Sequence, residues 1–227
     1  MLARDDLDDA ATDVDGGFPR VPFHEAHLIK GRLTAVKPSR RGSAKIERSR
    51  LAPAISCGIV LARMDLRPAT LADLPILRTW DQQPHVRAAA GDFTGFDWEG
   101  ELPRTANWRE LLIAEIGGGP IGMIQIIDPA REETHYWGDV AANLRAIDIW
   151  IGDAANLGRG HGREMMRLAV ERCFAAAAVT AILIDPLVAN VRAHRFYERM
   201  GFRRTERRMF GEDDCYVYRL ERAQWRG

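Results

Sequence analysis

The spacing of apolar residues changes several times along positions 64–227, and each spacing predicts one kind of element. Alternating apolar and polar residues are typical of a strand with one buried face. The strands predicted in this way are 65–67, the two arms of a hairpin within 111–127, 145–152, and the arms of a second hairpin at 203–210 and 215–220. A continuous apolar run at 180–184 predicts a strand that is buried on both faces.

Apolar residues three and four positions apart predict the helices. Four of them share one face of a helix that Thr70 can cap: Leu71, Leu74, Leu77 and Trp80. The same periodicity runs over 163–176 and 191–200, and Gly201 follows as a helix-ending glycine. The resulting order, β-α-β-β-loop-β-α-β-α-β-β, predicts an α+β fold around one central mixed β-sheet.

Composition narrows the class of protein. The chain has 227 residues, which suits one large domain with an appendage. Lys plus Arg and Asp plus Glu both number 32, so no net field attracts nucleic acid or an anionic membrane. No apolar run approaches the ~20 residues of a membrane-spanning helix. We therefore expect neither nucleic acid nor a membrane among the partners.

Cysteine and histidine usage argues against disulfides and metal. Cys57, Cys173 and Cys215 are odd in number and far apart, which fits neither a disulfide framework nor a zinc knuckle and indicates the reducing cytoplasm. Cys173 and Cys215 fall on the apolar side of a helix and on a hairpin strand, and neither is placed as a nucleophile. The six histidines lack the close pairs that bind metal, so we expect no metal.

The first part of the chain has a different pattern. Aspartates crowd the start of residues 1–63, basic residues follow over 30–50, and neither helical nor strand periodicity is sustained. Blocks of like charge without an apolar face do not offset the entropy of ordering. We expect 1–63 to be a disordered extension, or upstream sequence translated from a mis-assigned start. A self-contained domain then spans 64–227.

A glycine-rich turn separates the strand 145–152 from the helix 163–176. It reads Leu157-Gly158-Arg159-Gly160-His161-Gly162. Small residues let backbone approach a ligand, and free N–H groups at a helix start favour phosphate. The spacing fits neither a Walker motif nor a dinucleotide-binding fingerprint. The turn by itself leaves a phosphate site and a flexible helix-capping turn open.

In its context this turn resembles motif A of the GNAT N-acetyltransferase superfamily, Gln/Arg-x-x-Gly-x-Gly/Ala. The pattern's glycines fall on Gly160 and Gly162, and its first position falls on Leu157, which leaves the backbone cradle without that side-chain contact. Residues 190–202 resemble the second signature, N-x-x-A-x-x-x-Y-x-x-x-G-F. The likeness covers about 64–222 and implies a GNAT-type central mixed β-sheet flanked by helices.

This resemblance implies acetyl-CoA as the co-substrate. In the superfamily the glycine loop binds pyrophosphate, and the preceding strand lies beside the pantetheine arm. An asparagine approaches the pantetheine and a tyrosine approaches the sulfur. The implied cofactor-binding residues are Ile149, Trp150, Ile151, Leu157, Gly158, Arg159, Gly160, His161, Gly162, Arg163, Asn190 and Ala193. The implied tyrosine is Tyr197.

Within the superfamily the chain most resembles the aminoglycoside 6′-N-acetyltransferases. The matching segments are Tyr136-Trp137, 145–148, 157–162 and 185–197. Two tryptophans that usually follow His-Val in those enzymes are replaced, after His85-Val86, by Arg-Ala-Ala-Ala at 87–90. Siderophore acyltransferases, which act on hydroxylamine side chains, share the frame and tend to carry His where this chain has Asp148.

Amine acetylation gives chemical roles to two residues. A lysine-like amine has a pKa of about 10.4 and must lose a proton before it attacks. Asp148, on a central strand beside the cofactor groove, can hold the ammonium and help remove that proton; the alternative is an ion pair with Arg145 or Arg192. Tyr197 can donate to the departing thiolate, or it can be a core aromatic. Backbone N–H groups near Trp150 can stabilise the oxyanion.

Five residues are predicted to bind the acceptor. The amide of Gln125 faces either the cleft or solvent. Tyr136 and Trp137 can stack on a sugar ring, or they can pack the loop that carries them. Asp185 and Asp213 resemble acceptor-binding acids. The acceptor expected from these residues is a small cationic amine.

The leading hypothesis is an acetyl-CoA-dependent N-acetyltransferase that acts on a primary amine of a small, aminoglycoside-like acceptor. The alternatives are a siderophore-biosynthesis N-acyltransferase, an enzyme that acetylates protein amines, and a non-catalytic acyl-CoA-binding sensor. A nucleic-acid binder that uses the basic arm within 1–63 is a further alternative. Turnover of acetyl-CoA separates the enzymes from the binders. We expect a cytoplasmic monomer or homodimer.

Overall fold

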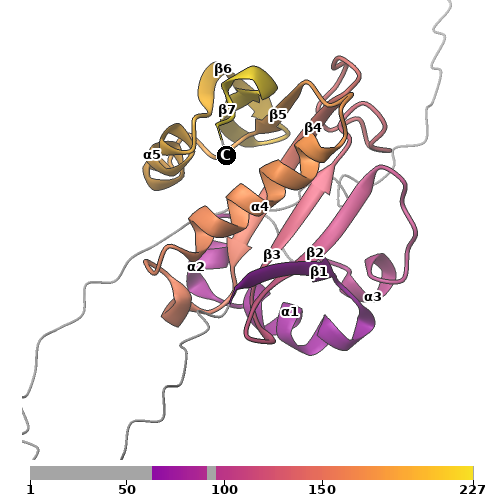
Figure 1. The fold of residues 1–227 in the computed structure, drawn as a ribbon, viewed down its shortest axis with the longest axis vertical. Helices are drawn as coiled ribbons and strands as arrows, with labels where there is room; N and C mark the ends of the chain where they lie inside the picture. The colour runs from indigo at the N-terminus through magenta and orange to yellow at the C-terminus, as the bar shows by residue number, and fades with distance from the viewer. Residues whose placement is uncertain (1–62, 91–95, 227) are drawn as a thin grey trace, which may run out of the picture.

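The computed structural model describes residues 63–90 and 96–226 (Figure 1). The predicted extension lies outside the described residues except for Arg63. The strands are β1 (Met64–Pro68), β2 (Arg109–Ile116), β3 (Gly119–Ile127), β4 (Leu144–Ile151), β5 (Ala181–Ile184), β6 (Arg203–Phe210) and β7 (Asp213–Glu221). They form one 7-stranded sheet in the order β1-β2-β3-β4-β5-β7-β6. Neighbours are antiparallel except the parallel pair β4 and β5, which confirms the predicted α+β fold with a mixed sheet.

Helices cover both faces of the sheet. They are α1 (Leu74–Asp81), α2 (Pro84–Arg87), α3 (Trp98–Glu101), α4 (His161–Ala175) and α5 (Val191–Arg199), with 3-10 turns η2 (Leu71–Asp73), η3 (Ala154–Asn156) and η4 (Arg222–Gln224). In Figure 1, α4 crosses one face of β3 and β4, and α5 lies beside the β6–β7 hairpin. The sequence did not predict α2 and α3, because four residues make a single turn that shows no period.

Two boundaries differ from those predicted. Helix α4 begins at His161 rather than at residue 163, so the last glycine of the turn, Gly162, lies inside the helix. The second hairpin turns at 211–212, and Asp213 and Asp214 belong to β7 rather than to the turn. The antiparallel ladder continues to the pair Phe210–Asp213, which places an acidic side chain within the sheet.

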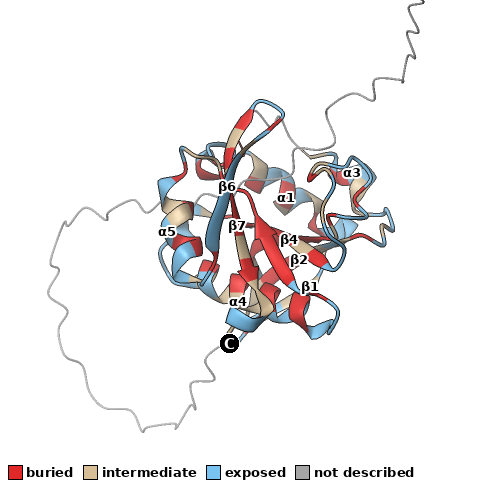
Figure 2. Ribbon diagram, turned by 90° about the horizontal axis from the view of Figure 1, so that it is seen from above, coloured by how far each residue is buried: buried red, intermediate tan, exposed pale blue. Residues whose placement is uncertain are grey.

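Successive side chains of β3 and β4 point to opposite faces of the sheet, so each strand contributes to the apolar core on both faces. Ile124, Ile147 and Ile149 pack with α4 and α5 in the largest apolar cluster. Met123 and Trp150 point to the other face and pack with α1, α2 and α3. Figure 2 shows the inner strands buried and β6, at the edge of the sheet, largely exposed.

β4 and β5 pair only over a short stretch. The parallel register runs from Leu144 opposite Ala181 to Ala146 opposite Leu183. From 147 to 151, β4 has no strand partner on that side among the described residues, because β5 ends at Ile184. The sheet therefore opens beside the second half of β4, on the edge that leads to the glycine turn.

Candidate active site

The floor of the site is made by two residues of β3 and β4. Gln125 and Asp148 are directly opposite in the antiparallel register, so their side chains leave the sheet on the same face, the face of Met123 and Trp150. Asp148 is half-buried, and its strand borders the opening between β4 and β5. Arg145, a predicted alternative partner of Asp148, donates to Asp128 at 3.1 Å.

Gln125 carries a buried amide that is unsatisfied in the described structure. Its side chain is 0% exposed, and neither Oε1 nor Nε2 has a hydrogen-bond partner among the described residues. Leaving such a group unpaired costs roughly 1–3 kcal/mol. A buried amide of this kind is expected where a ligand or an ordered water completes its hydrogen bonds. The structure therefore places Gln125 in the interior and not on the solvent face.

Tyr136 and Asp185 are joined by a hydrogen bond. The Tyr136 hydroxyl donates to Oδ2 of Asp185 at 2.5 Å. Burial, followed by the charge and hydrogen bond of Asp185, raises the pKa of Tyr136, so this hydroxyl stays protonated. The Tyr136 ring stacks on Phe210 at 4.6 Å between centroids, and Phe210 is opposite Asp213 in the β6–β7 ladder. Tyr136 and Asp185 thus come together from a loop and the end of β5, and the Phe210 ring links Tyr136 to the strand pair in which Asp213 lies.

Trp137 lies deeper than its neighbour. Its side chain is 3% exposed and meets Phe210 edge-on, with 5.2 Å between ring centroids. It packs in the apolar cluster that contains Trp108, Leu183 and Val217. This packing supports the loop that carries Tyr136. The structure thus favours the loop-packing alternative for Trp137 over direct stacking on an acceptor.

Tyr197 lies in the main core, beside the opening between β4 and β5. It is 4% exposed and its ring meets those of Phe196, Phe202 and Tyr218. Burial, followed by the charges of Asp148 and Asp185, raises its pKa. The hydroxyl consequently stays protonated over the working range of an enzyme.

Backbone atoms, rather than side chains, face the opening along β4. The side chains of Ile149, Trp150 and Ile151 are all buried in the two apolar clusters on either side of the sheet. A ligand beside this strand therefore meets N–H and C=O groups. A chain that carries amides can pair with such an edge as an added strand does.

The glycine turn leads directly into α4. Gly158 and Gly160 have φ angles of 73° and 86°, a conformation that L side chains rarely adopt. Gly160 is the N-cap of α4, and a Cβ at Gly158 or Gly160 would meet nothing within 4 Å. Leu157 packs against the core, whereas Arg159 is exposed. The turn thus presents open backbone, with His161 in the first helical turn, at the positive end of a 15-residue helix.

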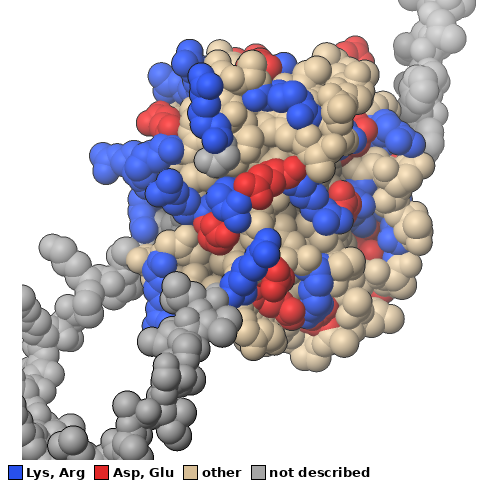
Figure 3. All heavy atoms as spheres, viewed as in Figure 1, with Lys and Arg blue, Asp and Glu red and all other residues tan. Residues whose placement is uncertain are grey.

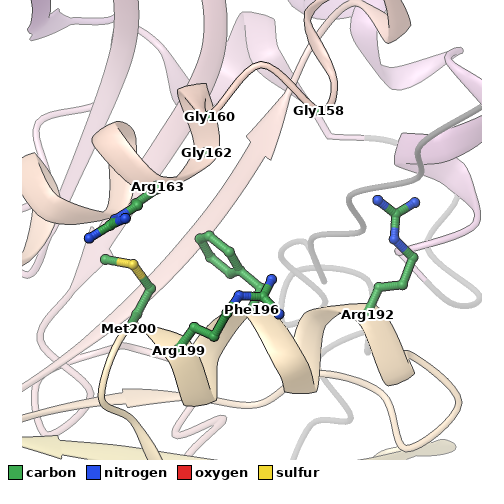
Figure 4. Close-up of a pocket in the computed structure, with 8 residues that line it drawn as sticks. All are labelled: Gly158, Gly160, Gly162, Arg163, Arg192, Phe196, Arg199 and Met200. Carbon is green, nitrogen blue, oxygen red and sulfur yellow. The ribbon is translucent and has the colours of Figure 1, made fainter.

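A cavity of about 450 Å³ lies between this turn and α5 (Figure 4). Its lining residues are Gly158, Gly160, Gly162, Arg163, Arg192, Phe196, Arg199 and Met200. Three of them are arginines, and none of the described lining residues is acidic. Guanidinium groups and helix-start N–H groups are the donors that phosphates prefer. The cavity therefore fits the phosphates of a nucleotide-containing ligand such as acetyl-CoA.

Sequence reasoning missed the contribution of α5 to this cavity. Arg192, Phe196 and Arg199 are four and three positions apart, so they occupy one face of the helix. That spacing was visible in the sequence. Figure 3 shows basic side chains gathered over α5 and β6, and in the sequences of these two elements all of them are arginines.

Asn190 and Ala193 are joined at the start of α5. Oδ1 of Asn190 accepts from the Ala193 N–H at 3.2 Å and caps the helix, and both residues are buried. This hydrogen bond fixes the first turn of α5. Cys173 is buried too, and burial raises the pKa of its thiol to about 12, which agrees with the prediction that it is no nucleophile.

These features define a class of protein: an α+β domain that binds a phosphorylated ligand where its mixed sheet opens. The ligand site consists of the opening between β4 and β5, the glycine turn at the start of α4 and the arginine-lined cavity. The chain belongs to the GNAT acetyltransferase family, since the profile described as "Acetyltransferase (GNAT) domain" matches residues 69–210. It is therefore an acyltransferase. Within the described ranges, no helix is both long and apolar enough to cross a bilayer.

Within this family, the chain is similar to aminoglycoside acetyltransferases. It is 37% identical over 151 residues to "Aminoglycoside N(6')-acetyltransferase type 1" of Klebsiella pneumoniae and to the protein of that name from Serratia marcescens. Each match covers 61% of this chain and 73% of the relative. Among solved structures, AAC(6')-Ib in complex with ribostamycin and coenzyme A is 26% identical, with a TM-score of 0.62. That match covers 71% of this chain and 94% of the solved one.

Proposed function

We propose that this protein transfers the acetyl group of acetyl-CoA to a primary amine, the 6′-amine, of an aminoglycoside-like acceptor. Similar proteins are named for this activity, and related structures hold coenzyme A together with ribostamycin or kanamycin. The observation that carries the proposal is the pairing of Asp148 with Gln125 on adjacent strands, at the opening between β4 and β5. A carboxylate and an unpaired amide there suit a polar, cationic acceptor.

The cofactor side of the site is assigned to the turn and to α5. The open backbone of Gly158 and Gly160, the first turn of α4 and the guanidinium groups of Arg163 and Arg199 would hold the phosphates. The unpaired edge of β4 over 147–151 would hold the amide-bearing arm. Acetyl-CoA supplies the acetyl group as a thioester, and the amine nitrogen takes that group as the C–S bond breaks.

Asp148 is the proposed base. A protonated amine cannot attack, and a half-buried carboxylate can bind the ammonium and accept its proton once the acceptor is positioned. The same carboxylate orients the amine toward the opening in the sheet. Holding both reactants in register supplies a large share of the rate enhancement, and no covalent enzyme intermediate is needed.

Tyr197 is the proposed partner of the departing thiolate. Its raised pKa keeps the hydroxyl in the donor form, and its position beside the opening lets it donate to a sulfur there. The core aromatics around its ring hold that donor in one orientation. Asp148 would thus take a proton from the attacking amine, and Tyr197 would donate a hydrogen bond to the departing thiolate.

The acceptor side is assigned to three acids, an amide and a tyrosine. Asp148, Asp185 and Asp213 concentrate negative charge beside Gln125 and Tyr136, and such a field favours a molecule with several ammonium groups. Tyr136 holds Asp185 in place through its hydroxyl. A monoamine can fill only part of this arrangement, so a polycationic acceptor is favoured over a single lysine-like amine.

Release of the CoA thiol across a panel of acceptors tests this proposal. We expect turnover with aminoglycosides that bear a 6′-amine, and a loss of about 10²–10⁴-fold in kcat for Asp148→Asn with acetyl-CoA binding retained. Glu110→Gln is the matched control, because Glu110 is also a strand carboxylate but pairs with Arg172 of α4. Turnover only with a hydroxylamine-bearing lysine would instead assign the enzyme to siderophore assembly. Unchanged turnover in Asp148→Asn would remove this residue from the mechanism.

A further inference from the structure

The last peptide of β4 is held from both sides. The Gly152 N–H donates to the Ile121 carbonyl of β3 at 2.9 Å. The carbonyl of Ile151 lies 2.8 Å from Nε2 of His85, a buried residue of α2. Since a carbonyl oxygen can only accept, Nε2 must carry a proton and donate it. The end of the strand is thus fixed by a neighbouring strand on one side and by an imidazole on the other.

His85 stands on the open edge of β4. The C=O and N–H of a trans peptide point in opposite directions. Because the Gly152 N–H points toward β3, the Ile151 carbonyl points toward the side from which β5 has departed. Backbone groups alternate in direction along a strand, so the N–H and C=O of Ile149 also face that opening. His85 therefore binds the Ile151 carbonyl at the end of the open edge. The backbone groups of Ile149, earlier along the same edge, stay accessible to a ligand.

Packing against Trp80 restricts the same peptide. A Cβ at Gly152 would lie 1.9 Å from the Trp80 ring, so this ring rests directly on the Gly152 backbone. Trp80 is 0% exposed and belongs to α1, while His85 belongs to the short helix that follows. The two helices together brace the end of β4. Without the imidazole, the Ile151 carbonyl would be left unpaired in a buried position unless the strand end moved.

We infer that His85 is a positioning residue for acyl-CoA: it fixes the open edge of β4 against which the amide-bearing pantetheine arm pairs. The inference rests on the proposed function, because it takes a CoA thioester as the ligand of that edge. His85 is absent from the lining of the phosphate cavity. Its effect is therefore confined to the arm and the acyl group and does not extend to the phosphates.

Two ligands separate these contributions. Coenzyme A carries the phosphates and the pantetheine arm, whereas 3′,5′-ADP carries phosphates without the arm. With the full chain in a calorimeter, we expect His85→Leu to bind coenzyme A roughly tenfold more weakly than wild type and 3′,5′-ADP equally well. His85→Gln, whose amide nitrogen can reach the Nε2 position, should restore most of the affinity. His85→Asn, whose side chain is shorter, should not restore the affinity. If His85→Leu fails to fold, the comparison of the Gln and Asn variants tests the inference in its place.

Val86→Ala is the control for stability alone. Val86 is the next residue of α2, is as buried as His85 and packs in the cluster that contains Trp80, but its side chain has no hydrogen-bond donor for the Ile151 carbonyl. We expect it to lower the melting temperature and to leave coenzyme A affinity unchanged. Wild-type affinity for coenzyme A in His85→Leu, or equal losses for both ligands in the Gln and Asn variants, would overturn the inference. If wild type binds coenzyme A no more tightly than 3′,5′-ADP, the proposed function itself is wrong, and this inference with it.

Discussion

Single residues in this protein show two ways of burying a polar group. Asp73 is buried with its hydrogen bonds satisfied, since Arg67 donates to both of its oxygens at 2.7 and 2.6 Å and the Thr70 N–H donates at 2.8 Å. Gln125 is buried more completely and has no partner among the described residues. The first arrangement stabilises the fold, whereas the second is costly and fits a residue kept for its ligand.

Replacement of Gln125 by Met tests that distinction. The two side chains are similar in size, so Gln125→Met removes the unpaired amide without leaving a cavity. We expect the free energy of unfolding to rise by about 1 kcal/mol and kcat/KM for the acceptor to fall about tenfold. Thermal unfolding and steady-state kinetics measure the two effects. A variant that is both less stable and fully active would show that the amide has a structural partner.

The Asp73 carboxylate makes part of the stability depend on pH. The Arg67 hydrogen bonds hold the pKa of Asp73 below its usual range, so this residue stabilises the fold above its unfolded pKa of about 3.9. The contribution is lost as pH falls through the lower, folded pKa. We expect Asp73→Asn to be less stable than wild type at pH 7, with the difference shrinking below pH 4. Urea unfolding at several pH values measures it, and a constant difference would contradict the assignment.

At the scale of elements, the site depends on where each one begins and ends. β5 stops early and opens the sheet, α4 begins at the glycine turn, and α5 places one face against that turn. Gly158 and Gly160 are required by conformation, because both have positive φ angles.

The structure offers a matched pair for separating conformation from access. Gly118, in the β2–β3 turn, has a φ of 78°, close to the 86° of Gly160, and at both positions a Cβ would project into open space. Alanine at either position should cost about 1 kcal/mol of stability. Only Gly160→Ala should also weaken coenzyme A binding, by roughly tenfold, because its Cβ projects where phosphates would approach. If both variants bind coenzyme A with equal affinity, the phosphates do not bind at this turn.

At the scale of the whole molecule, the described residues pack into three apolar clusters. All three consist of residues from Met64 to Trp225, and β1 is paired with β2 from its first residue, Met64, opposite Ile116. The domain boundary predicted at residue 64 stays a prediction, because residues 1–62 lie outside the part of the chain that the structure describes.

A shortened chain that starts at Met64 tests the boundary. We expect a melting temperature within about 2 °C of the full chain, since no described core contact is removed. Coenzyme A affinity should also be unchanged. Calorimetry of both proteins measures the two quantities. A drop of several degrees would mean that residues 1–63 pack on the domain, and a change in affinity alone would mean that they reach the ligand.

Most of the fold could be predicted from periodicity. The order of strands and longer helices agreed with the structure because each spans several residues of one clear period. The helices α2 and α3 could not be predicted, since single turns carry no period. Of the site, the glycine turn and the segment 190–202 were recognisable as local motifs. The α5 residues Phe196 and Arg199 were visible as one helical face and were missed.

Local pattern was sufficient for the class of fold and for the position of the glycine turn, because each depends on residues close together in the chain; the role of Asp148 stays a prediction. Contacts between distant segments could not be read in that way. The Tyr136–Asp185 bond, the buried amide of Gln125 and the hold of His85 on the Ile151 carbonyl join residues that lie far apart in sequence or depend on burial by other elements. Only packing of the whole sheet with its helices brings these groups together, and that packing makes an open strand edge into a site.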